Sequence, residues 1–309
     1  MKATATAHAN IALVKYWGKK DDALLLPEAA SLSVALDKLL TTTTVELGDF
    51  PSDSLRLDGR AEDPRRARAL LDAAGISLRA RIASRNEFPT AAGLASSASG
   101  FAALAVAACA AAGLDKSREE LSALARLGSG SATRSVPGGW AVWERESARQ
   151  VYPPAHWDLR FCVAICAGGE KDVGSRDGMR LTRDSSPYHA AWIEQCKRDL
   201  PEALRLLAAR DLAALGALAE RNALRMHADA LAAAPPLVYW QPPTVASLHA
   251  LRELRKQGVA AFATIDAGPH VVAMCRPEDA SAVEARLRAV AGIADVLVCA
   301  PAGGARVLP

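Results

Sequence analysis

Hydrophobic positions change their spacing along the chain, and this change separates two kinds of secondary structure. Short apolar runs separated by turns predict strands in the first half, followed by two predicted helices. The strands are predicted at residues 3–14, 41–47 and 78–84, and the helices at 97–112 and 117–126. From about residue 186, apolar residues recur at helical spacing, and Gly258 is expected to end the last helix of this series. These helices are predicted at residues 187–207, 211–232 and 245–257.

The last part of the chain predicts an α+β unit. Apolar runs at residues 260–265 and 270–275 flank the turn sequence Asp-Ala-Gly-Pro, which predicts an antiparallel hairpin. A helix at 277–291 and a strand at 296–299 complete an αββαβ order. Because 309 residues exceed the usual size of one compact core, two domains are expected, divided as residues 1–175 and 176–309.

Composition and charge narrow the possible functions. Hydrophobic residues make up 50% of the chain and charged residues 23%, as in an ordinary globular protein. The net charge of +3 is spread along the sequence, which suits small anionic ligands better than nucleic acid. We find no signal-peptide pattern and no strongly apolar run of bilayer length, so a cytoplasmic protein without a membrane partner is expected. The cysteines form no CxxC pair and the histidines no metal motif, so buried thiols and no protein-held metal are expected.

The segment FPTAAGLASSASG, residues 88–100, is the strongest local signal for chemistry. Small residues gather where an irregular segment meets a predicted helix, and a helix N-terminus offers unpaired N–H groups and partial positive charge to a phosphate. It is no Walker A loop, because no Gly-Lys-Ser/Thr follows at the required spacing. The alternative is that Ser96 and Ser97 only cap a core helix.

Three further segments carry candidate functional groups. NIALVKYWGKKD brings Asn10, Lys15, Tyr16 and Lys19 to a strand end, where they suit a multiply charged substrate or, alternatively, are solvated lysines and their neighbours. In GSGSATRSVPGG, Arg134 could grip a carboxylate in two parallel hydrogen bonds or serve a structural ion pair. In TIDAGPH, Asp266 directly follows the predicted strand and is either a candidate catalytic acid or base or an ordinary turn residue.

Together these segments resemble the signatures of the diphosphomevalonate decarboxylases, a family of the GHMP kinase superfamily. The first is similar to that family's phosphate-binding loop, and the other three resemble its further signatures in the same order; NALRMHADAL and GMRLT look familiar as well. The resemblance implies an α+β GHMP kinase fold. Its N-terminal domain is a ribosomal protein S5 domain 2-like α/β unit, its C-terminal domain is a ferredoxin-like α+β unit, and the active site lies in the cleft between them.

The resemblance also implies an activity and assigns residues to it. The expected reaction is ATP-dependent decarboxylation of mevalonate 5-diphosphate to isopentenyl diphosphate, in a homodimer that uses ATP and Mg²⁺. The implied reaction-centre residues are Asp266, Arg134, Lys15 and Asn10. The implied substrate ligands are Tyr16, Lys19, Ser129, Gly130, Ser131, Arg134 and Ser175. The implied ATP ligands are Pro89, Gly93, Leu94, Ala95, Ser96, Ser97 and Lys171.

Some residues depart from the family pattern and leave alternatives open. The stretch Pro27-Glu28-Ala29-Ala30 stands where a polar Asn/Ser pair is expected, and His270 replaces an expected Asn. These changes bear on substrate detail more than on reaction class. The alternatives are a decarboxylase acting on the 5-monophosphate, a 3-kinase that stops after phosphorylation, and a non-catalytic ATP-binding sensor on the same fold.

Overall fold

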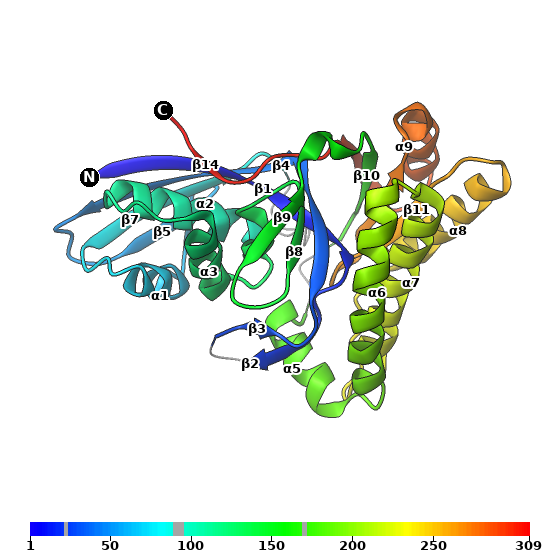
Figure 1. Cartoon of the computed structure of the whole chain (residues 1–309), viewed down its shortest axis with the longest axis horizontal. Helices are drawn as coiled ribbons and strands as arrows, with labels where there is room; N and C mark the ends of the chain where they lie inside the picture. The colour runs from blue at the N-terminus through cyan, green and yellow to red at the C-terminus, as the bar shows by residue number, and fades with distance from the viewer. Residues whose placement is uncertain (22–23, 89–95, 169–171) are drawn as a thin grey trace.

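The computed structural model describes residues 1–21, 24–88, 96–168 and 172–309, and its strands form two main sheets flanked by helices (Figure 1). The first sheet is eight-stranded, and its main path runs β14-β1-β4-β7-β5-β6, with β8 and β9 branching from β4. Its strands are β1 (Lys2–Val14), β4 (Ser31–Gly48), β5 (Ser54–Leu57), β6 (Arg60–Glu62), β7 (Arg79–Asn86), β8 (Trp140–Trp143), β9 (Ala148–Tyr152) and β14 (Arg306–Val307).

One helix forms the centre of the first domain. Helix α2 (Ser96–Ala111) is rich in alanine, and its small side chains are buried in one apolar cluster with residues of β1, β4 and β7. The same cluster takes in the buried faces of α1 (Arg65–Ala73) and α3 (Arg118–Gly128). Helix α3 begins with a capping box between Ser117 and Glu120, which satisfies backbone donors at its first turn. The packing fixes the N-terminal end of α2 beside the end of α3.

The second sheet is covered by helices on both faces. Its strands are antiparallel in the order β11-β12-β10-β13: β10 (Arg160–Cys166), β11 (Phe262–Ile265), β12 (Val271–Cys275) and β13 (Ile293–Cys299). One face packs against α8 (Pro242–Lys256) and α9 (Ala280–Arg288). The other face packs against α6 (His189–Ala209) and α7 (Leu212–Leu231), which also meet apolar residues of β1 and β4. This shared core joins the two domains.

The main predicted elements of the second domain are confirmed, including the β11–β12 hairpin and the order α8-β11-β12-α9-β13. All six cysteines are buried and free, as expected. Several elements were not predicted: α5 (Ser175–Ser185), the strands β2 (Lys19–Asp21) and β3 (Leu26–Pro27), which pair with each other, and α1, β5, β6, β9 and β14. Strand β4 was predicted only over residues 41–47. The remaining short helices are α4 (Ala132–Ser135), η2 (Pro154–His156) and η3 (Pro277–Asp279).

The chain returns to the first sheet at its C-terminal end. Strand β14 pairs antiparallel with β1, and the adjacent segment bonds to β4 through Ala302 N–H and Ala35 C=O at 2.8 Å. The red C-terminal segment in Figure 1 therefore lies along the blue N-terminal strand. The second sheet is thus built from residues that lie between β9 and β14 in sequence. In the described part of the chain, no helix is both long and apolar enough for a membrane crossing.

Candidate active site

A partly buried ion pair joins the two domains where β1 ends. Lys15 directly follows β1 and is 1% exposed, and its Nζ donates to Asp266 Oδ1 at 2.6 Å and to the carbonyl of Ala12 at 2.9 Å. Asp266 directly follows β11, and its side chain is 34% exposed. Burial lowers the pKa of Lys15, and the neighbouring Asp266 carboxylate opposes that effect. The amine can neutralise negative charge on a bound ligand, and the partly exposed carboxylate beside it can accept a proton from that ligand.

Three long-range contacts hold this pair in place. The backbone N–H of Lys15 donates to Asn222 Oδ1 of α7 at 2.8 Å, and Thr264 Oγ1 of β11 donates to the carbonyl of Ala12 at 3.0 Å. On the far side, His227 Nε2 lies 3.1 Å from the carbonyl of Asp266. Burial, with help from the positive charge of Lys15, lowers the pKa of His227 to about 4, so this imidazole is neutral near neutral pH.

Another buried cation near Lys15, Arg134, has polar partners but no counterion at contact distance among the described residues. Arg134 lies on α4 and is 3% exposed; its Nε donates to Asn10 Oδ1 at 3.1 Å and its Nη1 to Ser31 Oγ at 2.7 Å. The orientation of the Asn10 amide is fixed by a second hydrogen bond, in which its Nδ2 donates to Ser135 Oγ at 2.8 Å. Among the described residues, no carboxylate forms an ion pair with this guanidinium, and burial lowers its pKa to about 10. Such a group is ready for an anionic ligand.

Tyr16 and the loop between α3 and α4 approach each other closely. Tyr16 packs on Trp143 with ring centroids 4.5 Å apart. A Cβ placed on Gly130 would lie 2.7 Å from Tyr16 Oη, so glycine is required for this approach. Ser129 Oγ lies 3.1 Å from Ser131 Oγ and 3.2 Å from Ser97 Oγ, the latter on the first turn of α2. Two predicted substrate-binding segments and one predicted ATP-binding residue therefore meet here.

Lys19 lies beside the start of α5. Its side chain is buried, and its Nζ donates to the carbonyl of Arg176 at 3.3 Å, one residue after Ser175. Nearby, the guanidinium of Arg66 stacks on Phe101 at 4.6 Å and donates to the carbonyl of Gly128. Burial, and then repulsion from Arg176, lowers the pKa of Arg66 to about 10. Both arginines line a cavity of about 460 Å³ together with Leu25, Asp63, Arg65, Ala69 and Leu127.

The predicted ATP-binding segment is described only from its helical end. Ser96 is the first residue of α2, and the exposed Ser97 follows it. The remaining predicted ATP ligands lie outside the described residues: Pro89, Gly93, Leu94, Ala95 and Lys171. Among the residues described, no group of three His, Cys, Asp or Glu side chains could hold a metal ion.

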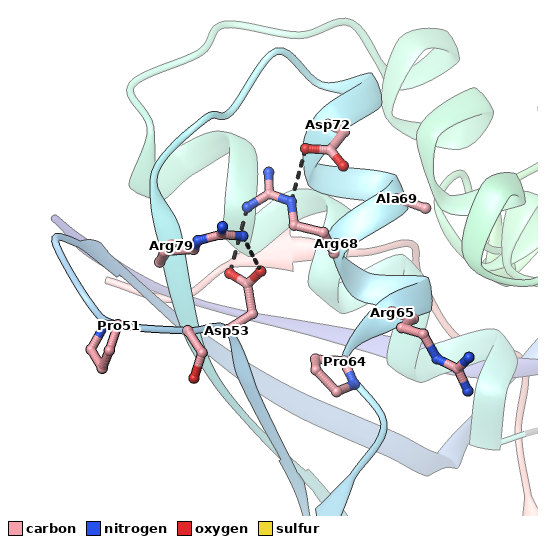
Figure 2. Close-up of a pocket in the computed structure, with 9 residues that line it drawn as sticks. Pro51, Asp53, Pro64, Arg65, Arg68, Ala69, Asp72 and Arg79 are labelled. Carbon is pink, nitrogen blue, oxygen red and sulfur yellow. Dashed lines mark hydrogen bonds and ion pairs between the residues drawn. The ribbon is translucent and has the colours of Figure 1, made fainter.

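A second hollow, on the outer side of α1, has a different character (Figure 2). Asp53 faces two guanidinium groups across it, those of Arg68 at 3.5 Å and Arg79 at 3.2 Å. Arg68 also reaches Asp72 at 2.8 Å. The charges of Asp53, Asp72, Arg68 and Arg79 are paired with one another, so these residues form a structural ion-pair cluster.

The structure adds residues that the sequence analysis did not single out. Ser31, Asn222 and His227 bond directly to Arg134, to the backbone of Lys15 and to Asp266. Asn222 and His227 stand in NALRMHADAL, and the resemblance of this segment to the family pattern was the available signal. The contribution of Arg66 and Arg176 had no comparable signal, because each stands in an ordinary charged stretch.

The two-domain fold places the chain in the GHMP kinase structural class. Family models match both halves: the diphosphomevalonate decarboxylase-like N-terminal domain covers residues 7–151, and the mevalonate 5-diphosphate decarboxylase C-terminal domain covers residues 161–300. The chain therefore belongs to the diphosphomevalonate decarboxylase family.

Individual relatives agree over most of the chain. Diphosphomevalonate decarboxylase mvd1 of Aspergillus fumigatus is 36% identical over 94% of this chain and 81% of its own length. The Homo sapiens diphosphomevalonate decarboxylase is 36% identical over 87% of this chain and 75% of its own. A solved complex of MDDEF with MVAPP, AMPPCP and magnesium superposes with a TM-score of 0.93 and 35% identity, covering 100% of this chain and 99% of that one.

Proposed function

We propose that the protein converts mevalonate 5-diphosphate to isopentenyl diphosphate, ADP, phosphate and CO₂, with 3-hydroxyl phosphorylation preceding loss of phosphate and CO₂. The observation that carries this proposal is the buried Arg134, held by Asn10 and Ser31 with no carboxylate paired to it among the described residues. A buried guanidinium in this state suits the substrate carboxylate that leaves as CO₂. The neighbouring Lys15–Asp266 pair supplies the acid–base chemistry for phosphorylation of the 3-hydroxyl.

In this proposal Asp266 orients the 3-hydroxyl and accepts its proton. Its side chain is one-third exposed, so it can reach a ligand in the cleft, while Lys15 is held beneath it. Lys15 neutralises charge on Asp266 and on the phosphoryl group in transit. Phosphoryl transfer depends mainly on alignment and charge neutralisation, and this pair contributes to both.

The polar end of the substrate fits the second group of residues. Tyr16, Lys19 and Ser129 to Ser131 would hold its phosphate groups, with Ser175 at the start of α5. The guanidiniums of Arg66 and Arg176 add positive charge beside Lys19, which supports the diphosphate over the monophosphate.

ATP would bind at the N-terminus of α2, where Ser96 and Ser97 precede an alanine-rich helix and partial positive charge favours phosphate. Mg²⁺, bound through the nucleotide's phosphates, would neutralise charge on the transferred group. The relative solved with MVAPP, AMPPCP and magnesium supports this pair of ligands. A homodimer in the cytoplasm is part of the proposal, and sedimentation velocity tests the dimer.

One assay separates the competing activities. Purified protein is incubated with ATP, Mg²⁺ and either mevalonate 5-diphosphate or its 5-phosphate, and ADP and CO₂ are measured separately. Equal amounts of ADP and CO₂ from the diphosphate are expected. ADP without CO₂ would make the protein a 3-kinase, a preference for the 5-phosphate would make it a monophosphate decarboxylase, and ATP binding without either product would make it a sensor.

A further inference from the structure

A buried group of three ionisable side chains lies behind the substrate-binding segment and outside the reaction centre. His189, the first residue of α6, has Nδ1 2.8 Å from Asp229 Oδ2 of α7 and Nε2 3.2 Å from Glu28 Oε2, just after β3. The side chains of His189 and Asp229 are 7% and 1% exposed, and that of Glu28 is 32% exposed. Glu28 is one of the positions at which the chain departs from the family pattern.

The geometry indicates which protonation state this group requires. Each imidazole nitrogen faces a carboxylate oxygen, and only a protonated imidazole has hydrogens on both nitrogens. Asp229 Oδ1 is also buried, with no hydrogen-bond partner among the described residues, so the charge on this carboxylate depends on His189 for compensation. The α6 dipole opposes a cation at this position, which leaves the two carboxylates to hold the proton.

The charged groups around His189 also favour its protonated form. Burial lowers the pKa of His189, but the hydrogen bonds and charges of Asp229 and Glu28 outweigh it, so the net shift is upward. The first turn of α6 has no acidic residue. On the neighbouring α5, Arg183 bonds to the carbonyl of Lys19 at 3.1 Å and to Asp184 at 2.9 Å.

The triad also contacts the backbone that carries the proposed substrate ligands. A Cβ on Gly18 would lie 3.1 Å from Glu28 Oε2 and 3.2 Å from His189 Cε1, so the backbone at Gly18 packs directly against the pair. The N–H of Glu28 donates to the carbonyl of Gly18 at 3.2 Å, and Trp192 Nε1, one turn along α6, donates to the carbonyl of Trp17 at 2.8 Å. The placement of Tyr16 and Lys19 is therefore tied to α6 through this contact.

We propose that Glu28, His189 and Asp229 form a proton-dependent clamp that positions residues 16–19 for substrate binding and that loosens when His189 loses its proton. The inference rests on the proposed function, because it assigns Tyr16 and Lys19 to the substrate. After deprotonation, the remaining hydrogen stays on Nδ1, which faces the more deeply buried Asp229, and the contact with Glu28 is lost. Because the partners raise the pKa of His189, the clamp is complete below its unfolded value of 6.5 and is lost as the pH rises through the folded value.

Steady-state kinetics of the Glu28→Gln variant test the clamp. At about pH 6, the KM for mevalonate 5-diphosphate should rise about fivefold, the effect of losing a partly exposed ion pair, while kcat and the KM for ATP stay near wild type. At about pH 9 the rise in KM should disappear or reverse, since the wild-type clamp is then open while an amide at position 28 can donate to the unprotonated Nε2. At each pH the KM of the variant for mevalonate 5-diphosphate is divided by that of wild type, which cancels the effect of the substrate's own ionisation on KM. His249→Gln, on the exposed face of α8, is the matched control and should follow wild type throughout.

A ratio that stays constant with pH, or a loss confined to kcat, would overturn the clamp. A second measurement does not depend on activity: NMR titration of the His189 ring in the full chain. A midpoint above 6.5 in wild type that falls in Glu28→Gln is expected, and a wild-type midpoint below 6.5 would also overturn the clamp. If mevalonate 5-diphosphate is not turned over at all, the proposed function fails, whereas the NMR titration still decides whether the clamp exists.

Discussion

Replacing Arg134 with lysine tests the assignment of the carboxylate site without removing its charge. The guanidinium donates through Nε to Asn10 and through Nη1 to Ser31, and it would meet the substrate carboxylate with its remaining donors. A lysine ammonium is a single point of donation and cannot keep both protein contacts while gripping a carboxylate at two oxygens. Each hydrogen bond to a charged group contributes about 1.5–3 kcal/mol, so losing one or two of them costs about 3 kcal/mol in the transition state. That corresponds to roughly a 150-fold fall in kcat/KM for CO₂ release.

The assay measures CO₂ and ADP in parallel, with thermal unfolding as a check on folding. Arg205→Lys is the matched control, because that arginine is 65% exposed on α6 and pairs with Glu202 at the surface. Its rate should equal that of wild type. If the folded Arg134→Lys variant released CO₂ at the wild-type rate, the carboxylate would bind elsewhere and the proposed use of this buried cation would be wrong.

Three further variants probe other parts of the site. Asp266→Ala should lower turnover at least about a hundredfold while ATP affinity, measured by titration, changes little; near-normal turnover would remove Asp266 from its role as proton acceptor. Gly130→Ala places a Cβ 2.7 Å from Tyr16 Oη, so the KM for mevalonate 5-diphosphate should rise about tenfold with the KM for ATP unchanged, and equal changes in both would contradict the assignment of Tyr16 to the substrate. Burial lowers the pKa of His227 to about 4, so as the pH falls from 6.5 the unfolded chain binds this proton before the folded chain does. The free energy of unfolding should therefore fall by about 3 kcal/mol between pH 6.5 and 4. Denaturant unfolding of His227→Gln should show a weaker pH dependence than wild type, and an unchanged dependence would mean that other groups cause it.

The sequence predicted local features of this molecule well. The first strand, α2 and the β11–β12 hairpin follow from apolar spacing and from turn residues such as Gly268, because these signals act between near neighbours. The small strands β2 and β3 lack such a signal. They are short, and the contacts of residues 17–19 with α5 and α6 supply what their sequence does not.

The candidate site was predictable as a set of residues but not as an arrangement. Motif spacing and resemblance selected Lys15, Arg134 and Asp266, yet Lys15 and Asp266 are 251 positions apart and meet only when β11 packs beside the end of β1. The same holds for Asn222, which supports Lys15 from 207 positions away. Such contacts are set by helix packing over the whole second domain. No local pattern of polar residues records them.

The pairing of β14 with β1 has a consequence for the order of assembly during synthesis. The first sheet uses strands from both ends of the chain, so its edge beside β1 stays unpaired until residues 306–307 have been made. Every element of the second sheet lies between these partners in sequence and is available earlier. A nascent chain in which residues 306–307 have not yet been made thus presents an unpaired edge at Ala5 and Thr6 of β1, to which another strand can add. The first sheet is therefore completed only after all strands of the second sheet have been synthesised, even though most of its own strands emerge first.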